Sequence, residues 1–406
     1  MPALLDSPAV AGQFPTLERE GLVYLDAAAT SQTPRSVVAA MDDYYNAHRA
    51  SVHRGVYPLA VEATELFEAG RTKAAAMVGW EPEATVLTRN ATEAINLVAH
   101  SWGRANVGRG DRIVLTEMEH HSNIVPWQLL AEAVGATVEW VPIDDEGHLV
   151  LEALDALLVA GGVKVVAVTH VSNVLGTINP VAEICARAHA AGAVVLVDGS
   201  QAVPQIAVDA AALDADFYAW TAHKAYGPTG IGVLHGRREL LEAMPPFLGG
   251  GHMISRVTKQ GSRYAGIPTR FEAGTSAIAE GVGLAAAMDF MDAIGSDAIR
   301  AHELDLAGYA LERLADVPGL EVHGPRDPEV RGALVSFALE GTHPHDVAEI
   351  LARRGVCVRA GHHCAQPLMQ RLGVGATSRA SFAVHNTRDD VDALVDGLGE
   401  VRRIFA

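Results

Sequence analysis

The sequence predicts an α/β protein with a mostly parallel, seven-stranded sheet and helices on both of its faces, followed by a smaller α+β domain. Between residues 84 and 234, short apolar runs alternate with segments of helical period. Beyond residue 296, helices and strands follow one another without that regular alternation. Strands buried on both faces give such near-continuous apolar runs, because helices cover a parallel sheet on each side.

Four successive parts are expected: a lead-in at 1–20, a large domain at 21–274, a linking helix at 275–295 and a small domain at 296–406. The strands of the large domain are expected at 84–87, 112–116, 137–142, 163–170, 193–198, 216–220 and 230–234. Helices are expected between them at 92–102, 124–134, 149–158 and 181–191, and before them at 36–47 and 61–78. Residues 236–274 show little periodicity and are expected to form a connector with active-site loops.

After a long helix at 278–294, the small domain is expected to hold helices near 296–316, 344–354 and 388–404, with strands near 320–323, 333–339, 356–359 and 379–384.

Composition excludes several classes of function. The net charge of −18 argues against a nucleic-acid-binding face and against binding to anionic membranes. No apolar run approaches a membrane span, and the first 20 residues lack the pattern of a signal peptide. Three cysteines, a sparse and odd number, predict a reducing, cytoplasmic setting without a disulfide framework.

Polar residues follow two expected neighbouring strands in the middle of the chain. One apolar run ends at Asp198, with Gln201 close behind, and the next ends at Thr221, His223 and Lys224. The carboxyl ends of strands in an open α/β sheet form the edge where ligands bind. An aldehyde cofactor such as pyridoxal 5′-phosphate (PLP) needs a lysine amine for a Schiff base and an acid at its pyridine nitrogen.

Lys224 and Asp198 are the candidates for those two functions. Gln201 could reach the ring hydroxyl, and Thr221 and His223 could hold the phosphate. The alternative is a lysine that caps a loop and an aspartate that ends a strand.

Three further polar turns follow expected strands. TRNATEAI, at 88–95, places Thr92 at a helix N-terminus, which is either an anion site or an ordinary N-cap. EMEHHSN, at 117–123, offers a histidine that could stack on a flat ring or move protons; no spaced partner supports a metal site. HVSNVLGT, at 170–177, offers Asn173 for a cofactor oxygen and a substrate carboxylate, or else a turn asparagine.

The loop RAGHHCAQPLM, at 359–369, places Cys364 beside two histidines and an arginine, which favour the reactive thiolate. The alternative is an inert buried cysteine. Cys185 and Cys357 lie inside apolar periodic runs and fit that alternative. Arg379, at the start of a strand, offers a fork for a carboxylate, and Arg359 is a weaker candidate to line the same site.

The chain resembles the group II (SufS-type) cysteine desulfurases, within the class V aminotransferase family of PLP enzymes of fold type I. The resemblance extends from about residue 14 to the C-terminus. It rests on VDGSQAVP, DFYAWTAHKAYGPTGIGVL, EMEHHSNIVPWQ, HVSNVLGTINP, RFEAGT and RAGHHCAQPLM. It implies the PLP cofactor and the conversion of L-cysteine to L-alanine, with a persulfide that supplies iron–sulfur cluster assembly. The alternative is a selenocysteine lyase or another class V PLP enzyme.

The resemblance also implies residue functions. Cys364 would take up the sulfur, His120 would lie over the pyridine face and Arg379 would anchor the α-carboxylate. His53 would lie at the substrate entrance, whereas His121 is expected to be structural. The family often has two threonines here, and Ala91 stands in place of the first, so that one hydroxyl contact to the phosphate would be missing.

RFEAGT ends at Thr275, which in the family reaches the phosphate of the neighbouring subunit, so a homodimer is expected. The segment that follows, SAIAEGVG, departs from the family pattern. HPHD, at 343–346, is either a helix-entry turn or a docking point at His345 for a sulfur acceptor. That acceptor would be a zinc-containing protein of the SufU type or a SufE-like protein.

Overall fold

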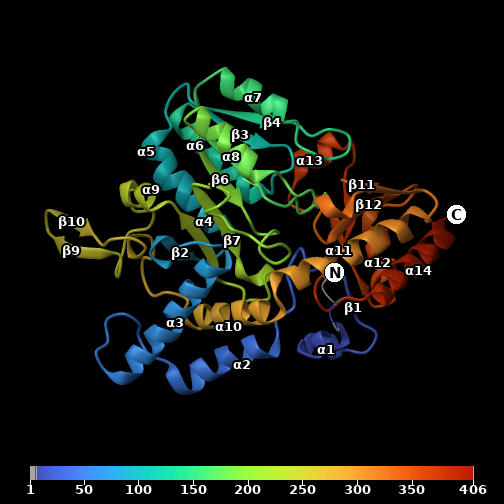
Figure 1. The fold of residues 1–406 in the computed structure, drawn as a ribbon, viewed down its shortest axis with the longest axis horizontal. Helices are drawn as coiled ribbons and strands as arrows, with labels where there is room; N and C mark the ends of the chain where they lie inside the picture. The colour runs from blue at the N-terminus through green and yellow to red at the C-terminus, as the bar shows by residue number, and fades with distance from the viewer. Residues whose placement is uncertain (1–4, 6, 406) are drawn as a thin grey trace.

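The computed structural model describes residue 5 and residues 7–405, so part of the expected lead-in at 1–20 lies outside the described residues. Figure 1 shows a larger lobe and a smaller lobe, the latter drawn in orange and red. Helix α10 (Ile278–Ile294) packs along α3 (Pro58–Met77) of the larger lobe and leads to α11 (Ser296–Ala315) in the smaller one. None of the helices described is long and apolar enough to cross a membrane.

The larger lobe is built on a seven-stranded sheet, as the sequence predicts. Its strands lie in the order β2 (Thr85–Thr88), β8 (Gly232–Gly236), β7 (Phe217–Thr221), β6 (Val194–Asp198), β5 (Val163–Thr169), β3 (Arg112–Thr116) and β4 (Thr137–Val141). β8 runs antiparallel to the other six strands. The carboxyl ends of β6 and β7 therefore lie side by side at one edge of the sheet.

Alternate residues of the strands pack on opposite faces of this sheet. On β7, Tyr218 and Trp220 belong to one apolar core, whereas Phe217 and Ala219 belong to the other. Burial of a side chain as large as Phe217 stabilises the fold by about 1.5–3 kcal/mol. One core is completed by α3, α7 (Leu151–Val159), α8 (Val181–Ala190) and α10, and the other by α4 (Ala91–Val98) and α6 (Val125–Val134). The predicted cover of helices on both faces is confirmed.

The smaller lobe has an antiparallel sheet in the order β11 (Leu320–His323), β12 (Leu334–Leu339), β15 (Thr377–Ser381) and β14 (Arg359–Gly361). Its helices are α11, α12 (Pro344–Arg353), the short α13 (Gln366–Arg371) and α14 (Arg388–Phe405). The strand predicted at 356–359 is divided, because β13 (Val356–Cys357) leaves this sheet and pairs with β1 (Val23–Tyr24). Leu25, which follows β1, lies in the core of the smaller lobe.

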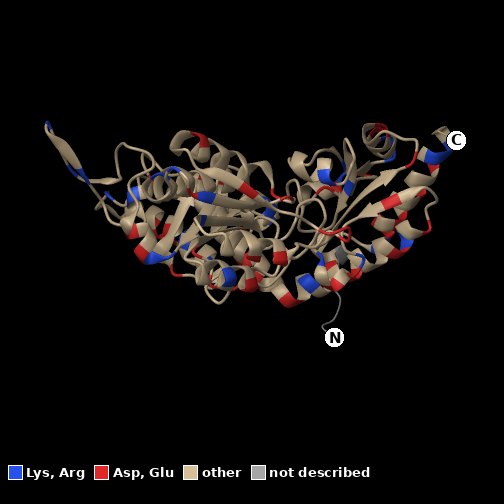
Figure 2. Ribbon diagram, turned by 90° about the horizontal axis from the view of Figure 1, so that it is seen from above, with Lys and Arg blue, Asp and Glu red and all other residues tan. Residues whose placement is uncertain are grey.

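The expected connector at 236–274 contains a β-hairpin that the sequence analysis missed. Its strands are β9 (Ile254–Thr258) and β10 (Gly261–Tyr264). Nearly every residue of the hairpin is exposed, so neither strand shows the alternation of apolar and polar residues that reveals a half-buried strand. Figure 2 shows the hairpin projecting from the larger lobe, with basic residues along it.

Candidate active site

A cavity of about 190 Å³ lies at the carboxyl ends of β6 and β7. It is lined by residues of both lobes, including most of those that the sequence predicts for the site. These are Ala91, Thr92, His120, Asn173, Asp198, Gln201, Thr221, His223, Lys224, Arg359, Cys364 and Arg379. Three predicted residues, His53, Thr275 and His345, are not part of its lining.

The sheet places an amine, a carboxylate and a hydroxyl in this cavity. A single 3₁₀ turn (Ala222–Lys224) carries Lys224 away from the end of β7. Burial lowers the pKa of Lys224, and the nearby charge of Asp198 opposes this effect. The Oδ1 atom of Asp198 accepts a hydrogen bond from the backbone N–H of Ser200 at 3.0 Å. The Oγ1 atom of Thr221 is buried and has no hydrogen-bond partner among the described residues.

These groups fit PLP. A buried hydroxyl without a partner costs about 1–3 kcal/mol, which a bound phosphate oxygen would offset at Thr221. The N-terminus of α4 offers backbone N–H groups near Thr92, a suitable place for an anion. An amine of lowered pKa and a carboxylate complete the set that an aldehyde on a protonated pyridine ring requires.

His120 is held in one neutral form by the turn after β3. Its Nδ1 atom accepts a hydrogen bond from the backbone N–H of Ser122 at 3.1 Å, which requires the ring proton to be on Nε2. Burial lowers the pKa of His120 to about 3, and the charge of Lys224 contributes further. The Oγ atom of Ser122 lies 2.7 Å from Oγ1 of Thr92. Ser122 therefore connects the histidine to the expected phosphate site.

The Cys364 loop is strained and is attached to the larger lobe. His363 and Cys364 have positive φ angles of 51° and 57°, a conformation that costs a non-glycine residue about 1–3 kcal/mol. The backbone N–H of His121 donates to the Cys364 carbonyl at 2.7 Å, and Nδ2 of Asn173 donates to the His363 carbonyl at 2.7 Å. Nε2 of His121 accepts from the backbone N–H of Gln366 at 3.0 Å. His121, expected only to be structural, thus holds the loop at Cys364 and at Gln366.

The other two cysteines lie in different surroundings. Cys185 is buried in the core, and burial raises the pKa of its thiol to about 12. Cys357 is half-buried on β13, and burial raises the pKa of its thiol as well. A raised pKa suppresses the thiolate, so both are poor nucleophiles. Cys364 alone among the three lines the cavity.

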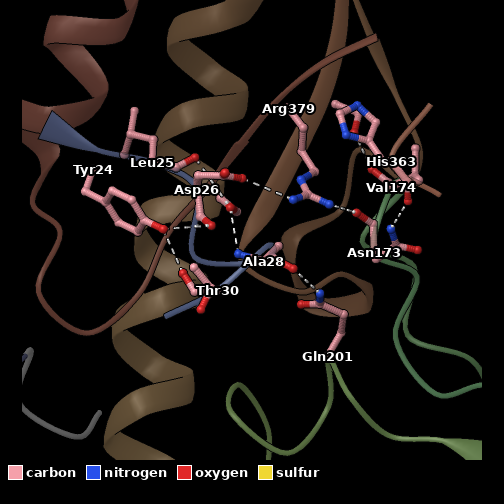
Figure 3. A network of polar contacts seen from close by, with 12 residues as sticks. Tyr24, Leu25, Asp26, Ala28, Thr30, Asn173, Val174, Gln201, His363 and Arg379 are labelled. Carbon is pink, nitrogen blue, oxygen red and sulfur yellow. Dashed lines mark hydrogen bonds and ion pairs between the residues drawn. The ribbon is translucent and has the colours of Figure 1, made fainter. Parts of the chain in front are cut away.

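Arg379 presents a buried guanidinium to the cavity (Figure 3). Its Nη1 atom donates to the Asn173 carbonyl at 2.7 Å, and its Nη2 atom pairs with Oδ1 of Asp26 at 3.2 Å. Burial lowers the pKa of Arg379 to about 10, which leaves it charged at neutral pH. Nε has no partner among the described residues. A buried guanidinium with a free N–H suits a carboxylate ligand.

Two side-chain amides that are predicted to contact the cofactor or the substrate bond to protein groups in this structure. The side-chain amide of Asn173 donates to the Cys364 loop, as described above. Nε2 of Gln201 donates to the Ala28 carbonyl at 2.7 Å, and its Oε1 atom accepts from Gln205 at 3.1 Å. Both amides thus hold the walls of the cavity in place. Their expected contacts to cofactor and substrate remain predictions.

The predicted residues outside the cavity lie at two other places. The His53 ring stacks on His252 at 5.0 Å, and its Nε2 atom lies 2.7 Å from Glu68. His252 and Thr275 line a second hollow of about 270 Å³. His345 is exposed at the start of α12, where its ring stacks on His343 at 5.3 Å.

The model of the aminotransferase class-V family matches residues 23–394. A cysteine desulfurase of Dickeya dadantii is 49% identical over 402 residues, which cover 98% of this chain and 97% of the relative. A cysteine desulfurase of Haloferax volcanii is 46% identical, over 99% of this chain and 98% of the relative. The chain belongs to the cysteine desulfurases of the class-V aminotransferase family. The apo structure of the cysteine desulfurase of Thermococcus onnurineus NA1 has the same fold, with a TM-score of 0.94, 40% identity and coverage of 100% and 99% of the two chains. The resemblance to this family that the sequence segments indicate is confirmed.

Sequence reasoning missed several residues that the family fold brings to the cavity. Those on its lining are Ala28, Ala29, Asn90, Ser122, Thr169, Ser200 and His363. Ser122, Ser200 and His363 lie within two residues of predicted site residues, so the motifs themselves carried a signal for them. No comparable signal marked Asp26, which lies 353 residues before its partner Arg379.

Proposed function

We propose that this protein is a PLP-dependent cysteine desulfurase that converts L-cysteine to L-alanine and leaves the sulfur as a persulfide on Cys364. One observation carries the proposal. Lys224 and Asp198 from the larger lobe and Cys364 from the smaller lobe line a single cavity. Relatives named cysteine desulfurases that match this chain over nearly its whole length support the same activity.

PLP would be held by residues of both the sheet and α4. Lys224 would bind it covalently, Asp198 would hold its pyridine nitrogen and His120 would lie against its ring. The phosphate would be held by Thr221, His223 and Thr92, with backbone N–H groups near Ala91. When bound, PLP supplies an electron-accepting ring that makes the α-proton of an amino acid acidic.

The protein's own groups then perform distinct steps. Lys224, with its lowered pKa, removes the α-proton as a neutral amine. The Cys364 thiolate attacks the substrate sulfur, so that a sulfur–sulfur bond forms as the carbon–sulfur bond breaks. The carbon that loses sulfur takes up a proton and becomes the methyl group of alanine. Arg379 anchors the α-carboxylate throughout, and Arg359 lines the cavity beside it.

The direct test is incubation with L-cysteine and a reductant, with alanine and sulfide measured together. Equal amounts of the two products are expected, because each turnover releases one alanine and one reducible persulfide sulfur. Alanine without sulfide, or neither product, would contradict the proposal. A selenocysteine lyase would instead act on L-selenocysteine and leave L-cysteine unchanged.

We further propose that the active form is a homodimer. Several large apolar side chains are exposed between α2 (Arg35–Asp43) and α3, among them Val56, which is 97% exposed, and Tyr57, which is 50% exposed. This region adjoins the hollow that Thr275 lines, and in the dimer Thr275 would reach the partner's phosphate site. His53 would lie near the substrate entrance. Light scattering at assay concentration should give a dimer, and an active monomer would exclude it.

The persulfide sulfur would pass to an acceptor protein, of the zinc-containing SufU type or a SufE-like protein, for iron–sulfur cluster assembly. The exposed ring of His345 would contribute to docking that acceptor. The three cysteines are free thiols, which supports the expected reducing, cytoplasmic setting.

A further inference from the structure

Arg379 already has a carboxylate partner in this structure, and that partner belongs to the chain itself (Figure 3). Nη2 of Arg379 lies 3.2 Å from Oδ1 of Asp26. The Arg379 side chain is only 2% exposed, whereas that of Asp26 is 23% exposed. A ligand carboxylate that binds Arg379 must therefore share the guanidinium with a second negative charge.

Asp26 is held in place independently of Arg379. It follows β1 and forms a β-bridge with Ser381, two residues beyond Arg379 on the same strand. The backbone N–H of Ala28 donates to Oγ of Ser381 at 2.9 Å, and the Tyr24 hydroxyl donates to the Thr30 carbonyl at 2.8 Å. The backbone on both sides of Asp26 is thus fixed, so its Cα atom keeps its distance from Arg379 when a ligand arrives.

The orientation of Arg379 does not depend on Asp26 alone. Its Nη1 atom donates to the Asn173 carbonyl at 2.7 Å, a bond that fixes the plane of the guanidinium from the opposite side. Nε is buried and has no partner among the described residues. Asp26 therefore supplies the negative charge beside Arg379, whereas the Asn173 carbonyl fixes the orientation of the guanidinium. Replacing Asp26 by asparagine, which has the same shape, can remove the charge alone.

We propose that Asp26 is a built-in competitor for Arg379 that weakens the binding of the substrate and product carboxylates. This inference rests on the proposed function of Arg379 as the carboxylate anchor. Between turnovers, Asp26 keeps the buried guanidinium paired, which avoids an uncompensated buried charge. When product is bound, repulsion between the two carboxylates favours its release. Asp26 thus acts through Arg379 and sets the affinity of the site.

The test compares Asp26→Asn with the wild-type holoenzyme. Asparagine keeps an oxygen that can accept from Nη2 but removes the negative charge. Binding of L-alanine and of ethylamine, which is alanine without its carboxylate, is followed by cofactor absorbance. Asp26→Asn should bind L-alanine about tenfold more tightly, because one nearby like charge is gone, and should bind ethylamine unchanged. Glu20→Gln, which removes an exposed carboxylate six residues before Asp26, is the matched control and should leave both affinities unchanged.

Each other result has a definite meaning. Weaker L-alanine binding with unchanged ethylamine binding would make Asp26 an orienting group and overturn the competition. Unchanged binding of both ligands, or weaker binding of both, would also overturn it. If neither the wild-type enzyme nor Asp26→Asn binds L-alanine better than ethylamine, then Arg379 is not the carboxylate anchor and that part of the proposed function fails.

Discussion

Lys224 and Cys364 line the same cavity, yet the chain delivers them in different ways. Lys224 lies one short turn beyond a strand that is buried throughout. Cys364 lies in a loop whose strained backbone is held by hydrogen bonds from the other lobe. The cofactor side of the site is thus fixed by the core of one lobe, whereas the nucleophile is fixed by contacts between lobes. Changes outside the core should therefore affect the nucleophile more than the cofactor.

The largest effect is expected from Lys224→Ala. It removes both the covalent link to PLP and the base, so alanine formation should fall by about 10⁴-fold. The purified wild-type protein should be yellow, and borohydride should fix the cofactor on Lys224. If Lys224→Ala still gives a borohydride-reducible adduct on the protein, the assignment of this residue is wrong.

Cys364→Ser should separate the two sides of the site. The variant should bind L-cysteine and shift the cofactor spectrum, because the cofactor side is intact. Alanine formation should fall by at least about 10²-fold, and no persulfide should form. Cys185→Ser and Cys357→Ser are the matched controls and should stay near wild-type activity. Alanine production that survives in Cys364→Ser would defeat the proposed mechanism.

His121→Ala tests whether the contacts between lobes position the nucleophile. It removes the acceptor for the Gln366 N–H, a bond worth about 0.5–1.5 kcal/mol. Activity should therefore fall about two- to tenfold, and iodoacetamide should alkylate Cys364 faster. The cofactor spectrum should not change. Gln370→Ala, at an exposed position of the helix that follows the loop, should leave both rates unchanged. Equal effects from the two variants would show that His121 does not position Cys364.

The neutral form of His120 should be visible in the pH dependence of stability. Its pKa in the folded protein, about 3, lies below that of an unfolded histidine, near 6.5. The unfolded chain therefore binds more protons as the pH falls below 6.5, and the folded state loses stability there. Between pH 7 and 5, the wild-type free energy of unfolding should fall by about 1–2 kcal/mol more than that of His120→Gln. The free energies are measured by urea denaturation. An equal fall for the wild-type protein and His120→Gln would show that His120 protonates normally.

The smallest effect on chemistry is expected from His345→Ala, because this residue does not line the cavity. The variant should keep its slow activity with a small-molecule reductant and lose only the stimulation by a zinc-bearing acceptor protein. Asp346→Asn, at the next position of the same helix, is the matched control. Equal losses with reductant and with acceptor would show that His345 supports the fold instead.

The sequence predicted the large sheet well because its strands are buried on both faces, as β6 and β7 show. Asp198 ends one of these strands and Lys224 lies one turn beyond the other, so the sequence also placed both residues at the carboxyl edge of the sheet. It failed at β9 and β10, where no burial imposes a pattern. It also missed Asp26, because only the paired strands of the smaller lobe bring this carboxylate to Arg379. The expected domain boundaries remain predictions.

The pairing of β1 with β13 has a consequence for synthesis of the chain. Val23 and Tyr24 must wait for Val356 and Cys357, which leave the ribosome about 330 residues later. At about 5–20 residues per second, this interval is roughly 15–70 seconds. Leu25, fully buried in the finished lobe, is without its native apolar neighbours for that time. The nascent chain therefore carries an uncovered apolar segment near its start until the last part of the smaller lobe has been synthesised.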